Sequence, residues 1–315
     1  MARHGLMIST ALASLLVAAP ARSELYQIAN VPNSTSTNIF GVNDSGIATG
    51  SWLDEDGVEH GYVGRPDGSD YTTFDDPNEP GPGTEPRGIS DKGYICGFGD
   101  SSSGSVDTYV TWERNPKNTV TEITRKGTVL NYFCQGFNGR NEFAGSYANA
   151  SLGVVAYLGQ NEKFKKSVTL KNISNTAVGA RGIDDAGDVV GWYYDTRGVQ
   201  NGFLLSGGRA FTIAFPGANY TVLEGINNKH QIAGQYQDTS GVLHGFIYDI
   251  SAKTFREIKV PGAVSFVQAW GINDMGQVAI GSDVGYYVYC PSSKNCFGGN
   301  NSFKHPTWKL QPLLP

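Results

Sequence analysis

Six residues that each stand directly before a recurring glycine are the strongest candidates for ligand chemistry in this sequence. They are Phe40, Arg87, Gln135, Arg181, Glu224 and Trp270. Their types differ from one repeat to the next, whereas the residues around them recur, so this position is free to serve a ligand. Arginine can hold a carboxylate through parallel hydrogen bonds, and an aromatic ring offers a stacking face. The set predicts a binding site for an acidic glycan or a small carboxylate.

Two histidines also occupy matching places, since His60 and His244 each precede a Gly-aromatic pair. A residue that recurs at one place of a repeat is expected to make a structural hydrogen bond to a neighbouring loop. The alternative is a ligand-binding or catalytic role, which histidine chemistry allows.

Acidic residues cluster in several turns and offer two further hypotheses. The turns are Asp54-Glu55-Asp56-Gly57, Asn43-Asp44, Asp184-Asp185 and Asn273-Asp274. Calcium binding would need more oxygen ligands than they supply, and Asp is common in turns for its own backbone hydrogen bonds. Asp75, Asp76 and Glu79 could act as paired carboxylates on a glycoside, although solvated loop acids are commoner. We therefore expect no metal and no cofactor, and the sequence contains no Gly-x-Ser-x-Gly elbow, His-Glu-x-x-His motif, P-loop or Rossmann fingerprint.

The elements that must position these residues come from a sixfold repeat. Its copies begin at Gly41, Gly88, Gly136, Gly182, Gly225 and Gly271. A regular period of 43 to 48 residues is typical of a repeat architecture. Each copy has a turn of the Asn-Asp-x-Gly kind, followed by a strand with a second glycine, which indicates a β-hairpin.

The third strand of each copy carries a small residue beside an aromatic one. These pairs are Gly61-Tyr62, Thr108-Tyr109, Ala156-Tyr157, Gly202-Phe203, Gly245-Phe246 and Gly285-Tyr286. Six aromatics at one repeat position predict a packed layer.

Fourth strands are expected at residues 71–77, 120–124, 167–173, 211–218 and 255–263. The sixth copy lacks one, and a matching strand lies at residues 25–32. This arrangement predicts an all-β fold, namely a six-bladed β-propeller of four-stranded antiparallel blades, closed by an N-terminal strand that completes blade 6. The first strand of each blade should be innermost, so the six candidate residues should ring the central channel, with Tyr220 and Gln268 in loops that lead to it. The alternative is that Arg87 or Arg181 pairs with Glu224 as buried ions of the core.

The chain divides into a leader, one domain and a tail. Residues 1–23 resemble a secretory signal peptide, with cleavage expected before Glu24, so we expect a secreted protein, extracellular or periplasmic, with no membrane span. Residues 24–289 form the propeller and residues 290–315 the tail. With 24 basic and 29 acidic residues and no basic run, nucleic acid is not an expected partner, and we expect a monomer.

Four cysteines in an exported chain suggest disulfides. Cys290 and Cys296 are expected to close a short loop in the tail. Cys96 and Cys134 are placed on adjacent blades, where they either pair or remain free as small buried apolar residues.

The motif GINDxGxxxGxYxDxxGxxHGF is nearly complete at residues 225–246 and 41–62, and the segment expected after such a motif, FTTIDxPGA, is present as FTIAFPGA at 211–218. With these residues the chain, over positions 25 to 289, resembles the bacterial extracellular HAF-repeat family. The resemblance implies secretion and repeated β-structure, and it carries no catalytic residues over. Copies three and six depart from the motif, the sixth with a shorter connection between its second and third strands.

Two functions are compatible with these observations. The first is a secreted, non-catalytic binding or scaffold propeller whose ligand lies at the channel mouth. The second is a secreted hydrolase or lyase that acts on an acidic polysaccharide. Carboxylates within catalytic reach of the channel mouth would favour the second.

Overall fold

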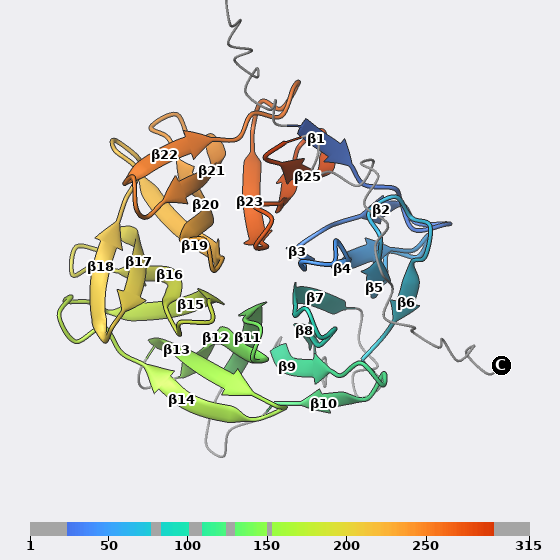
Figure 1. Ribbon diagram of the computed structural model, residues 1–315, viewed down its shortest axis with the longest axis horizontal. Coiled ribbons are helices and arrows are strands. Elements are labelled where there is room, and N and C mark those ends of the chain that lie inside the picture. The colour runs from blue at the N-terminus through green and yellow to red at the C-terminus, as the bar shows by residue number, and fades with distance from the viewer. Residues whose placement is uncertain (1–23, 77–82, 101–108, 124–129, 150–152, 293–315) are drawn as a thin grey trace, which may run out of the picture.

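The computed structural model describes residues 24–76, 83–100, 109–123, 130–149 and 153–292, and these residues form a ring of six β-sheets (Figure 1). Each sheet is a blade whose strands follow one another outward from the centre. The chain is therefore a six-bladed β-propeller, as the repeat predicted.

The blades have these strands in order from the centre outward. Blade 1 has β2 (Ser36–Thr37) and β3 (Gly41–Val42), then β4 (Ala48–Leu53), β5 (Glu59–Gly64) and β6 (Thr72–Phe74). Blade 2 has β7 (Thr84–Ile89), β8 (Ile95–Asp100), β9 (Tyr109–Arg114) and β10 (Val120–Glu122). Blade 3 has β11 (Leu130–Phe137), β12 (Glu142–Asn149), β13 (Gly153–Gln160) and β14 (Phe164–Val168).

The other three blades repeat this order. Blade 4 has β15 (Ala177–Ile183), β16 (Val189–Tyr194), β17 (Gln200–Ser206) and β18 (Arg209–Ile213). Blade 5 has β19 (Tyr220–Ile226), β20 (Gln231–Gln237), β21 (Leu243–Asp249) and β22 (Thr254–Glu257). Blade 6 has β23 (Val267–Ile272), β24 (Val278–Ser282) and β25 (Gly285–Cys290), with β1 (Glu24–Gln27) outermost. The fourth strand of blade 3 was predicted to begin at residue 167. It begins earlier, at Phe164, because it follows a tight turn at Asn161 and Glu162.

The ring closes through the N-terminal strand. β1 pairs antiparallel with β25, with Leu25 opposite Tyr289. The backbone N–H of Ile28 extends the pairing to Tyr286 O at 3.1 Å. The predicted closure is confirmed, and it covers the edge that β25 would otherwise expose to pairing with another chain.

The predicted aromatic layer lies where the third strands cross the second glycine of each copy. Tyr62 lies opposite Gly50 and Phe203 opposite Gly191, and both rings are fully buried. At Gly145 an added Cβ would lie 2.7 Å from the Tyr157 ring, so glycine leaves room for the ring there. In blade 2 the prediction of Thr108-Tyr109 is wrong, because Trp112 lies opposite Gly97 and fills the same place. The long connection before β9 shifts the aromatic residue along the sequence.

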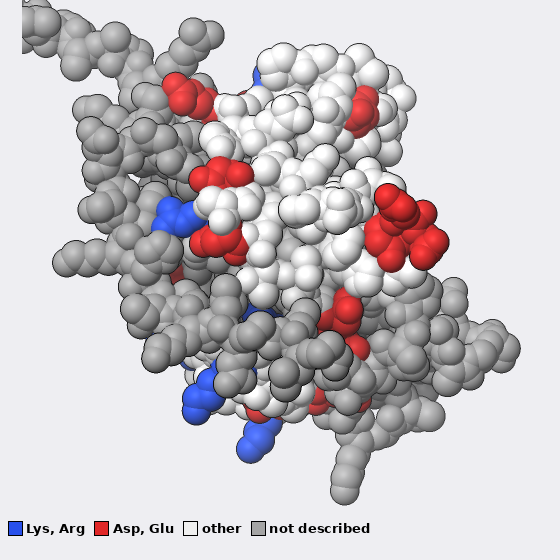
Figure 2. Space-filling view, turned by 90° about the vertical axis from the view of Figure 1, so that its right-hand side faces the viewer, with Lys and Arg blue, Asp and Glu red and all other residues white. Residues whose placement is uncertain are grey.

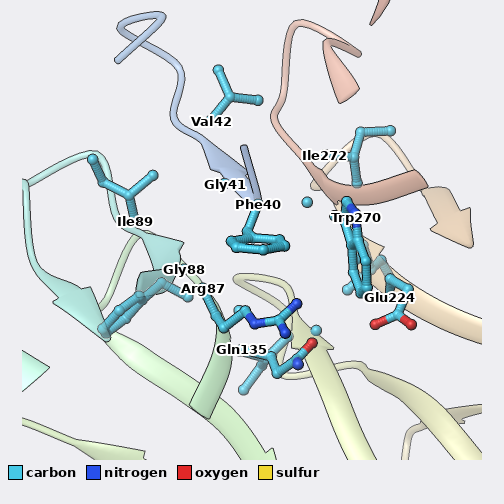
Figure 3. A pocket seen from close by; sticks show the side chains of 17 residues that line it. Phe40, Gly41, Val42, Arg87, Gly88, Ile89, Gln135, Glu224, Trp270 and Ile272 are labelled. Carbon is cyan, nitrogen blue, oxygen red and sulfur yellow. The ribbon is translucent and has the colours of Figure 1, made fainter. Parts of the chain in front are cut away.

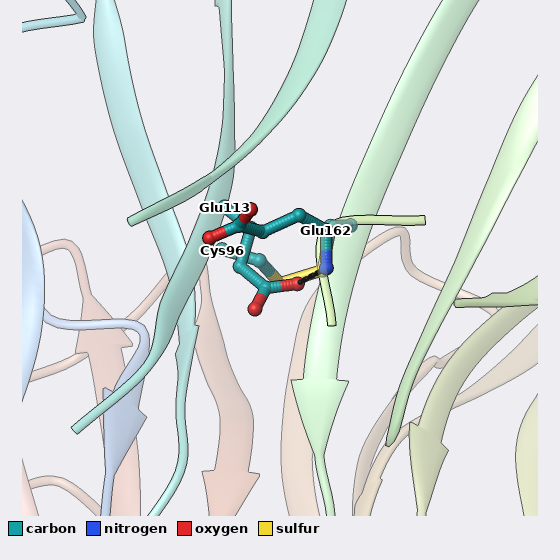
Figure 4. Close-up of a disulfide and its surroundings, with 4 residues drawn as sticks. Cys96, Glu113 and Glu162 are labelled. Atoms are coloured by element: carbon teal, nitrogen blue, oxygen red, sulfur yellow. Dashed lines mark hydrogen bonds between the residues drawn. A yellow bond between two sulfur atoms is a disulfide. The ribbon is translucent and has the colours of Figure 1, made fainter. Parts of the chain in front are cut away.

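A disulfide joins blades 2 and 3 (Figure 4). It links Cys96 on β8 to Cys134 on β11, with a Cα–Cα distance of 5.8 Å, and both cysteines are fully buried. Of the two arrangements that the sequence left open, pairing is the one found. The predicted partner of Cys290 is Cys296, which lies outside the described residues, as do the leader 1–23 and the tail from 293 to 315. The described ranges contain no helix of the length and apolar character that a membrane crossing requires.

Candidate functional site in the central channel

The six candidate residues are the bulged residues of the innermost strands. In blade 2, Pro86 pairs with Gly97 and Gly88 with Cys96, so Arg87 is an extra residue in the ladder. The same register shift falls at residues 135, 181 and 224, and in blade 6 between Ala269 and Ile272. In blade 1 it separates β2 from β3 at Phe40. A β-bulge redirects a side chain away from the sheet, and here each blade has one such side chain on its innermost strands.

The glycine after each bulge fixes how closely the blades meet. A Cβ atom added at Gly88 would lie 2.1 Å from the carbonyl oxygen of Gln135, and one at Gly136 would lie 2.7 Å from that of Arg181. At Gly41 the corresponding distance, to Arg87 O, is 3.1 Å. Only glycine allows innermost strands to approach so closely, and this explains why it recurs six times.

Five of the six candidate residues line a hollow on the axis, which we call the mouth hollow (Figure 3). Its free space is about 510 Å³ including its open end. Its mouth layer consists of Phe40, Arg87, Gln135, Glu224 and Trp270. Two residues further along each strand, an apolar layer consists of Val42, Ile89, Phe137, Ile183, Ile226 and Ile272. The predicted Arg181 is absent from this lining, although it contacts Glu224.

Arg87 lies against two aromatic rings of the mouth layer. Its guanidinium carbon is 4.0 Å from the Phe40 ring centroid and 5.0 Å from that of Trp270, so the cation lies against their π faces. One nitrogen, Nη2, pairs with Glu85. Among the described residues, no acceptor binds Nε or Nη1. Part of the hydrogen-bonding capacity of Arg87 is therefore left for another partner.

Glu224 is a buried carboxyl on the opposite wall. Its side chain is 3% exposed, Oε1 accepts a hydrogen bond from Gln235 Nε2 at 3.3 Å, and Oε2 lies 3.7 Å from Arg181 Nε. That separation makes an ion pair but is too long for a hydrogen bond. Burial raises the pKa of Glu224, against the opposing effect of Arg181 and Arg87. The alternative of a buried ion pair thus holds for Arg181 with Glu224, whereas Arg87 pairs with Glu85.

Glu85 and Gln235 belong to this network and were not predicted. Glu85 stands two residues before Arg87 on one strand, a spacing that places side chains on one face, and this signal could have found it. Gln235 reaches Glu224 through the pairing of β19 with β20, which sequence alone does not fix. Tyr220 and Gln268 lie within β19 and β23, so their predicted placement in loops is wrong, and neither lines the mouth hollow. The strands begin earlier because the ladder continues past the bulge.

A second hollow, the clasp hollow, lies beyond the apolar layer and is ringed by the turns of the six blades. In five of the six turns, the side chain at the second position accepts the backbone N–H of a neighbouring turn. These bonds are Asp44 N to Asp91 Oδ1, Gly139 N to Asp185 Oδ1, Asp185 N to Asn228 Oδ1, Asn228 N to Asp274 Oδ1 and Asp274 N to Asp44 Oδ1, at 2.7 to 2.8 Å. We call these residues the clasp ring. Between blades 2 and 3 the acceptor is missing, because Gly139 has no side chain, and this is the junction that the disulfide crosses.

The first residue of each acidic turn uses its side-chain oxygen on the backbone of its own turn. Asp54 Oδ1 accepts the N–H groups of Asp56 and Val58, and Asn43 Oδ1 accepts those of Ser45 and Ile47. The described residues contain no group of three or more His, Cys, Asp or Glu side chains that could hold a metal ion. These oxygens act as turn caps, whereas the carboxylates of Asp44, Asp185 and Asp274 belong to the clasp ring.

The two histidines are held between carboxylates, as their repeat position predicted. His60 contacts Asp75 at 2.7 Å and Asp54 at 3.3 Å, and its ring stacks on Trp52. Burial disfavours the imidazolium, but these two acids outweigh it and raise the pKa of His60. His244 repeats the arrangement with Glu257 at 2.8 Å and Asp238 at 3.0 Å. These contacts tie the outermost strand to the turn between the second and third strands.

The proposed carboxylate pair of Asp75 and Asp76 has other contacts in the structure. Asp75 accepts from His60, and the backbone N–H of Asp76 donates to Thr84 Oγ1 at 3.0 Å with Asp76 only 2% exposed. Glu79 lies outside the described residues. The side of the ring seen in Figure 2 shows separate acidic groups and few basic ones, with no continuous basic face among the atoms drawn in colour.

The fold and the axial site place the chain among the six-bladed β-propellers. No protein-family model matches it, and no curated protein matches it in sequence. Among solved structures it is similar to TolB from Acinetobacter baumannii, with a TM-score of 0.54 and 15% identity, covering 79% of this chain and 64% of that one. With the β-propeller domain of the Trilobed protease from Pyrococcus furiosus, the TM-score is 0.48 and the identity is 8%, over 81% of this chain and 96% of that one. With a fucose-specific lectin from Aleuria aurantia, the TM-score is 0.45 and the identity is 12%, over 72% of this chain and 80% of that one. At such identities these likenesses show the fold alone.

Proposed function

We propose that this protein is a secreted, non-catalytic binding propeller that holds a carboxylate in its mouth hollow. The ligand is a small carboxylate or the acidic unit of a glycan. The observation that carries the proposal is Arg87, whose Nε and Nη1 have no acceptor among the described residues while its guanidinium lies on the wall of the hollow. A buried donor without a partner costs free energy that a bound acceptor recovers.

The surroundings of Arg87 favour an anion. Burial raises the pKa of both Glu85 and Glu224, whereas the charges of Arg87 and Arg181 act in the opposite direction. The rings of Phe40 and Trp270 hold the guanidinium in place and exclude water from it. Charge-assisted hydrogen bonds are strongest in such a partly desolvated setting.

Calorimetric titration with a panel of carboxylates and acidic oligosaccharides tests the proposal. We expect Arg87→Gln to weaken the binding of every acid at least tenfold, because the charged donor is lost. Arg87→Lys retains the charge and the pairing with Glu85, so it separates charge from guanidinium geometry. Arg209→Gln is the matched control, since Arg209 also lies over an aromatic ring, that of Phe211, but on the outermost strand β18. Binding that is unchanged in Arg87→Gln would contradict the assignment.

A hydrolase or lyase acting on an acidic polysaccharide is the second candidate, and Glu224 favours it. A carboxyl whose pKa is raised by burial suits a general acid, and Glu224 lies on the wall of the hollow. The test is to incubate the protein with polyuronates and to measure new chain ends. Turnover that disappears in Glu224→Gln would establish catalysis, and binding without turnover would leave the first function.

Secretion and the HAF-repeat relationship are part of the same proposal. The disulfide between Cys96 and Cys134 supports folding in an oxidising compartment. Sequencing the N-terminus of the exported protein should find Glu24 as the first residue. A mature chain that still contains residues 1–23 would contradict the predicted cleavage before Glu24.

A further inference from the structure

The mouth hollow has two layers of opposite chemistry. The mouth layer contains Arg87, Gln135 and Glu224 together with two aromatic rings, whereas the apolar layer contains aliphatic side chains and Phe137. Both layers line one continuous hollow, and between them the wall is the backbone of the six glycines. A molecule bound there therefore meets charge at one end and hydrocarbon at the other.

The distance between the layers limits the size of that molecule. They are two residues apart along each strand, which corresponds to about 7 Å. With carbon–carbon bonds of about 1.5 Å, a chain of about five carbons covers up to about 6 Å, so its terminal methyl group comes within van der Waals contact of the second layer. The same apolar layer also lines the clasp hollow on its far side, so it lies between the two hollows, and we call it the floor of the mouth hollow. A ligand enters end-on, from the mouth.

The floor offers no partner for a polar group. Val42 and Ile226 are 5% and 6% exposed, and their aliphatic side chains neither donate nor accept hydrogen bonds. A hydroxyl placed against them loses its hydrogen bonds to water without replacement. A sugar acid carries hydroxyls around its whole ring, so it meets this cost wherever its ring touches the floor. A hydrocarbon chain gains free energy from the same contact.

We propose that the ligand is a small amphipathic monocarboxylate whose acid group meets Arg87 and whose unbranched, branched or aromatic hydrocarbon end contacts the apolar layer. This rests on the proposed function, because it takes the carboxylate at Arg87 as given. It narrows the ligand class to carboxylates with an apolar end, in preference to uronic acids.

Titration of the mature protein with a homologous series tests the inference. The probes are acetate, propanoate, butanoate, pentanoate, phenylacetate, glucuronate and the neutral alcohol 1-pentanol. Burial of each added methylene should tighten binding about fourfold, up to the length that reaches the floor. We expect glucuronate to bind no tighter than acetate, and 1-pentanol to bind far more weakly than pentanoate because it lacks the anion.

A variant of the floor gives an independent readout. Val42→Thr replaces one methyl group of β3 by a hydroxyl while retaining the branched shape that suits a strand. We expect it to reduce the affinity for pentanoate severalfold and to leave the affinity for acetate unchanged, because acetate does not reach the floor. A thermal melt establishes whether the Val42→Thr variant is folded. If the variant is unfolded, the titration of the unmodified protein with the carboxylate series tests the inference by itself.

The outcomes separate the two proposals. Affinity that does not change from acetate to pentanoate, glucuronate that binds more tightly than pentanoate, or 1-pentanol that binds as tightly as pentanoate would each overturn the inference. The first two of these results would leave carboxylate binding at Arg87 intact. If no acid binds at all, it is the proposed function that fails.

Discussion

The carboxylate of Asp44 accepts a hydrogen bond from the backbone N–H of Asp274 at 2.7 Å, although the two residues are 230 positions apart. This bond crosses the seam where blade 6 meets blade 1, and Asn273 Nδ2 to Asn43 O, at 2.9 Å, crosses it beside the first. The seam therefore has the same contacts as other junctions of the ring. Closure thus involves the clasp ring as well as the strand pairing of β1.

The clasp ring brings carboxylates close together, and this makes stability depend on pH. Burial and the charge of Asp91 raise the pKa of Asp44 to about 6. A carboxyl whose pKa is higher in the folded than in the unfolded state contributes most stability at low pH, and this contribution is lost as pH rises from about 4 to about 6. We expect Asp44→Asn to be more stable than the parent at pH 7, by about 1 kcal/mol after allowance for solvent screening.

The stability advantage of Asp44→Asn over the parent should disappear near pH 4, because Asp44 in the folded parent is then protonated and carries no charge, as asparagine does. Denaturant titrations at pH 4 and pH 7 measure it. Asn228 is the natural control, since it fills the same place in blade 5 and donates through Nδ2 to Asp185 and Asp274. Asn228→Asp should therefore lower stability at pH 7. An Asp44→Asn protein that is less stable than the parent at pH 7 would contradict the explanation.

The glycines after the bulges should not tolerate a methyl group, and the cost should follow the distance. Gly88→Ala places Cβ 2.1 Å from Gln135 O, so strands β7 and β11 must separate. We expect a loss of about 3 kcal/mol. Gly41→Ala, with its nearest atom Arg87 O at 3.1 Å, should cost about 1 kcal/mol. Equal melting temperatures for the two variants would show that blade spacing is not set by these contacts.

The disulfide should contribute strongly because it closes a loop of 38 residues. In the chain-entropy model such a loop corresponds to about 4 kcal/mol. We expect Cys96→Ala with Cys134→Ala to lower the free energy of unfolding by up to this amount, measured by denaturant titration without reductant. The parent in reductant is the control for cavity effects of the substitutions. A double variant as stable as the parent would be inconsistent with a structural role at this junction.

Glu113 lies beside the disulfide and is fully buried (Figure 4). Its Oε2 accepts the N–H of Glu162 at 2.9 Å, and burial raises the pKa of Glu113 to about 7. The folded protein therefore resists ionising this group, and stability falls as pH rises from about 4.5 to about 7. Glu113→Gln preserves an acceptor for Glu162, so we expect it to gain about 2 kcal/mol over the parent at pH 8 and nothing at pH 4. The check is the pH dependence of the unfolding free energy, and a gain that is equal at both pH values would contradict it.

A backbone prediction concerns His230, which has a φ of 59° where the corresponding turns have Gly46, Gly187 and Gly276. A side chain disfavours this left-handed conformation. We expect His230→Gly to raise the free energy of unfolding by about 0.5 to 1 kcal/mol. Gly187→Ala is the converse change and should lower it. Thermal melts of both variants provide the measurement.

The sequence predicted the scaffold because turns and strands recur with a period, and it predicted the closing strand because one copy lacked its fourth strand. Trp112 was missed because a longer connection displaced it from the position read in other copies. The bulge at Arg87 depends on hydrogen bonds between two strands, and the pairing of Arg87 with Glu85 depends on side-chain packing. Neither feature can be read from the repeat period of the sequence. The residues that line the channel could therefore be predicted, but not the side chains with which they pair.

A bulged residue makes no pair in the ladder of its strand, so its amino-acid type can change during evolution while the strand pairing stays the same. Substitution of Gln135 or Trp270 alters the lining without altering which residues pair around it. The repeat thus offers one position in each blade at which a side chain can change without a change in strand pairing, while Arg181 and Glu224 are coupled to each other through their ion pair. A library randomised at the codons of Phe40, Gln135 and Trp270 would vary the lining of the mouth hollow and leave the pairs of Arg87 with Glu85 and of Arg181 with Glu224 in place.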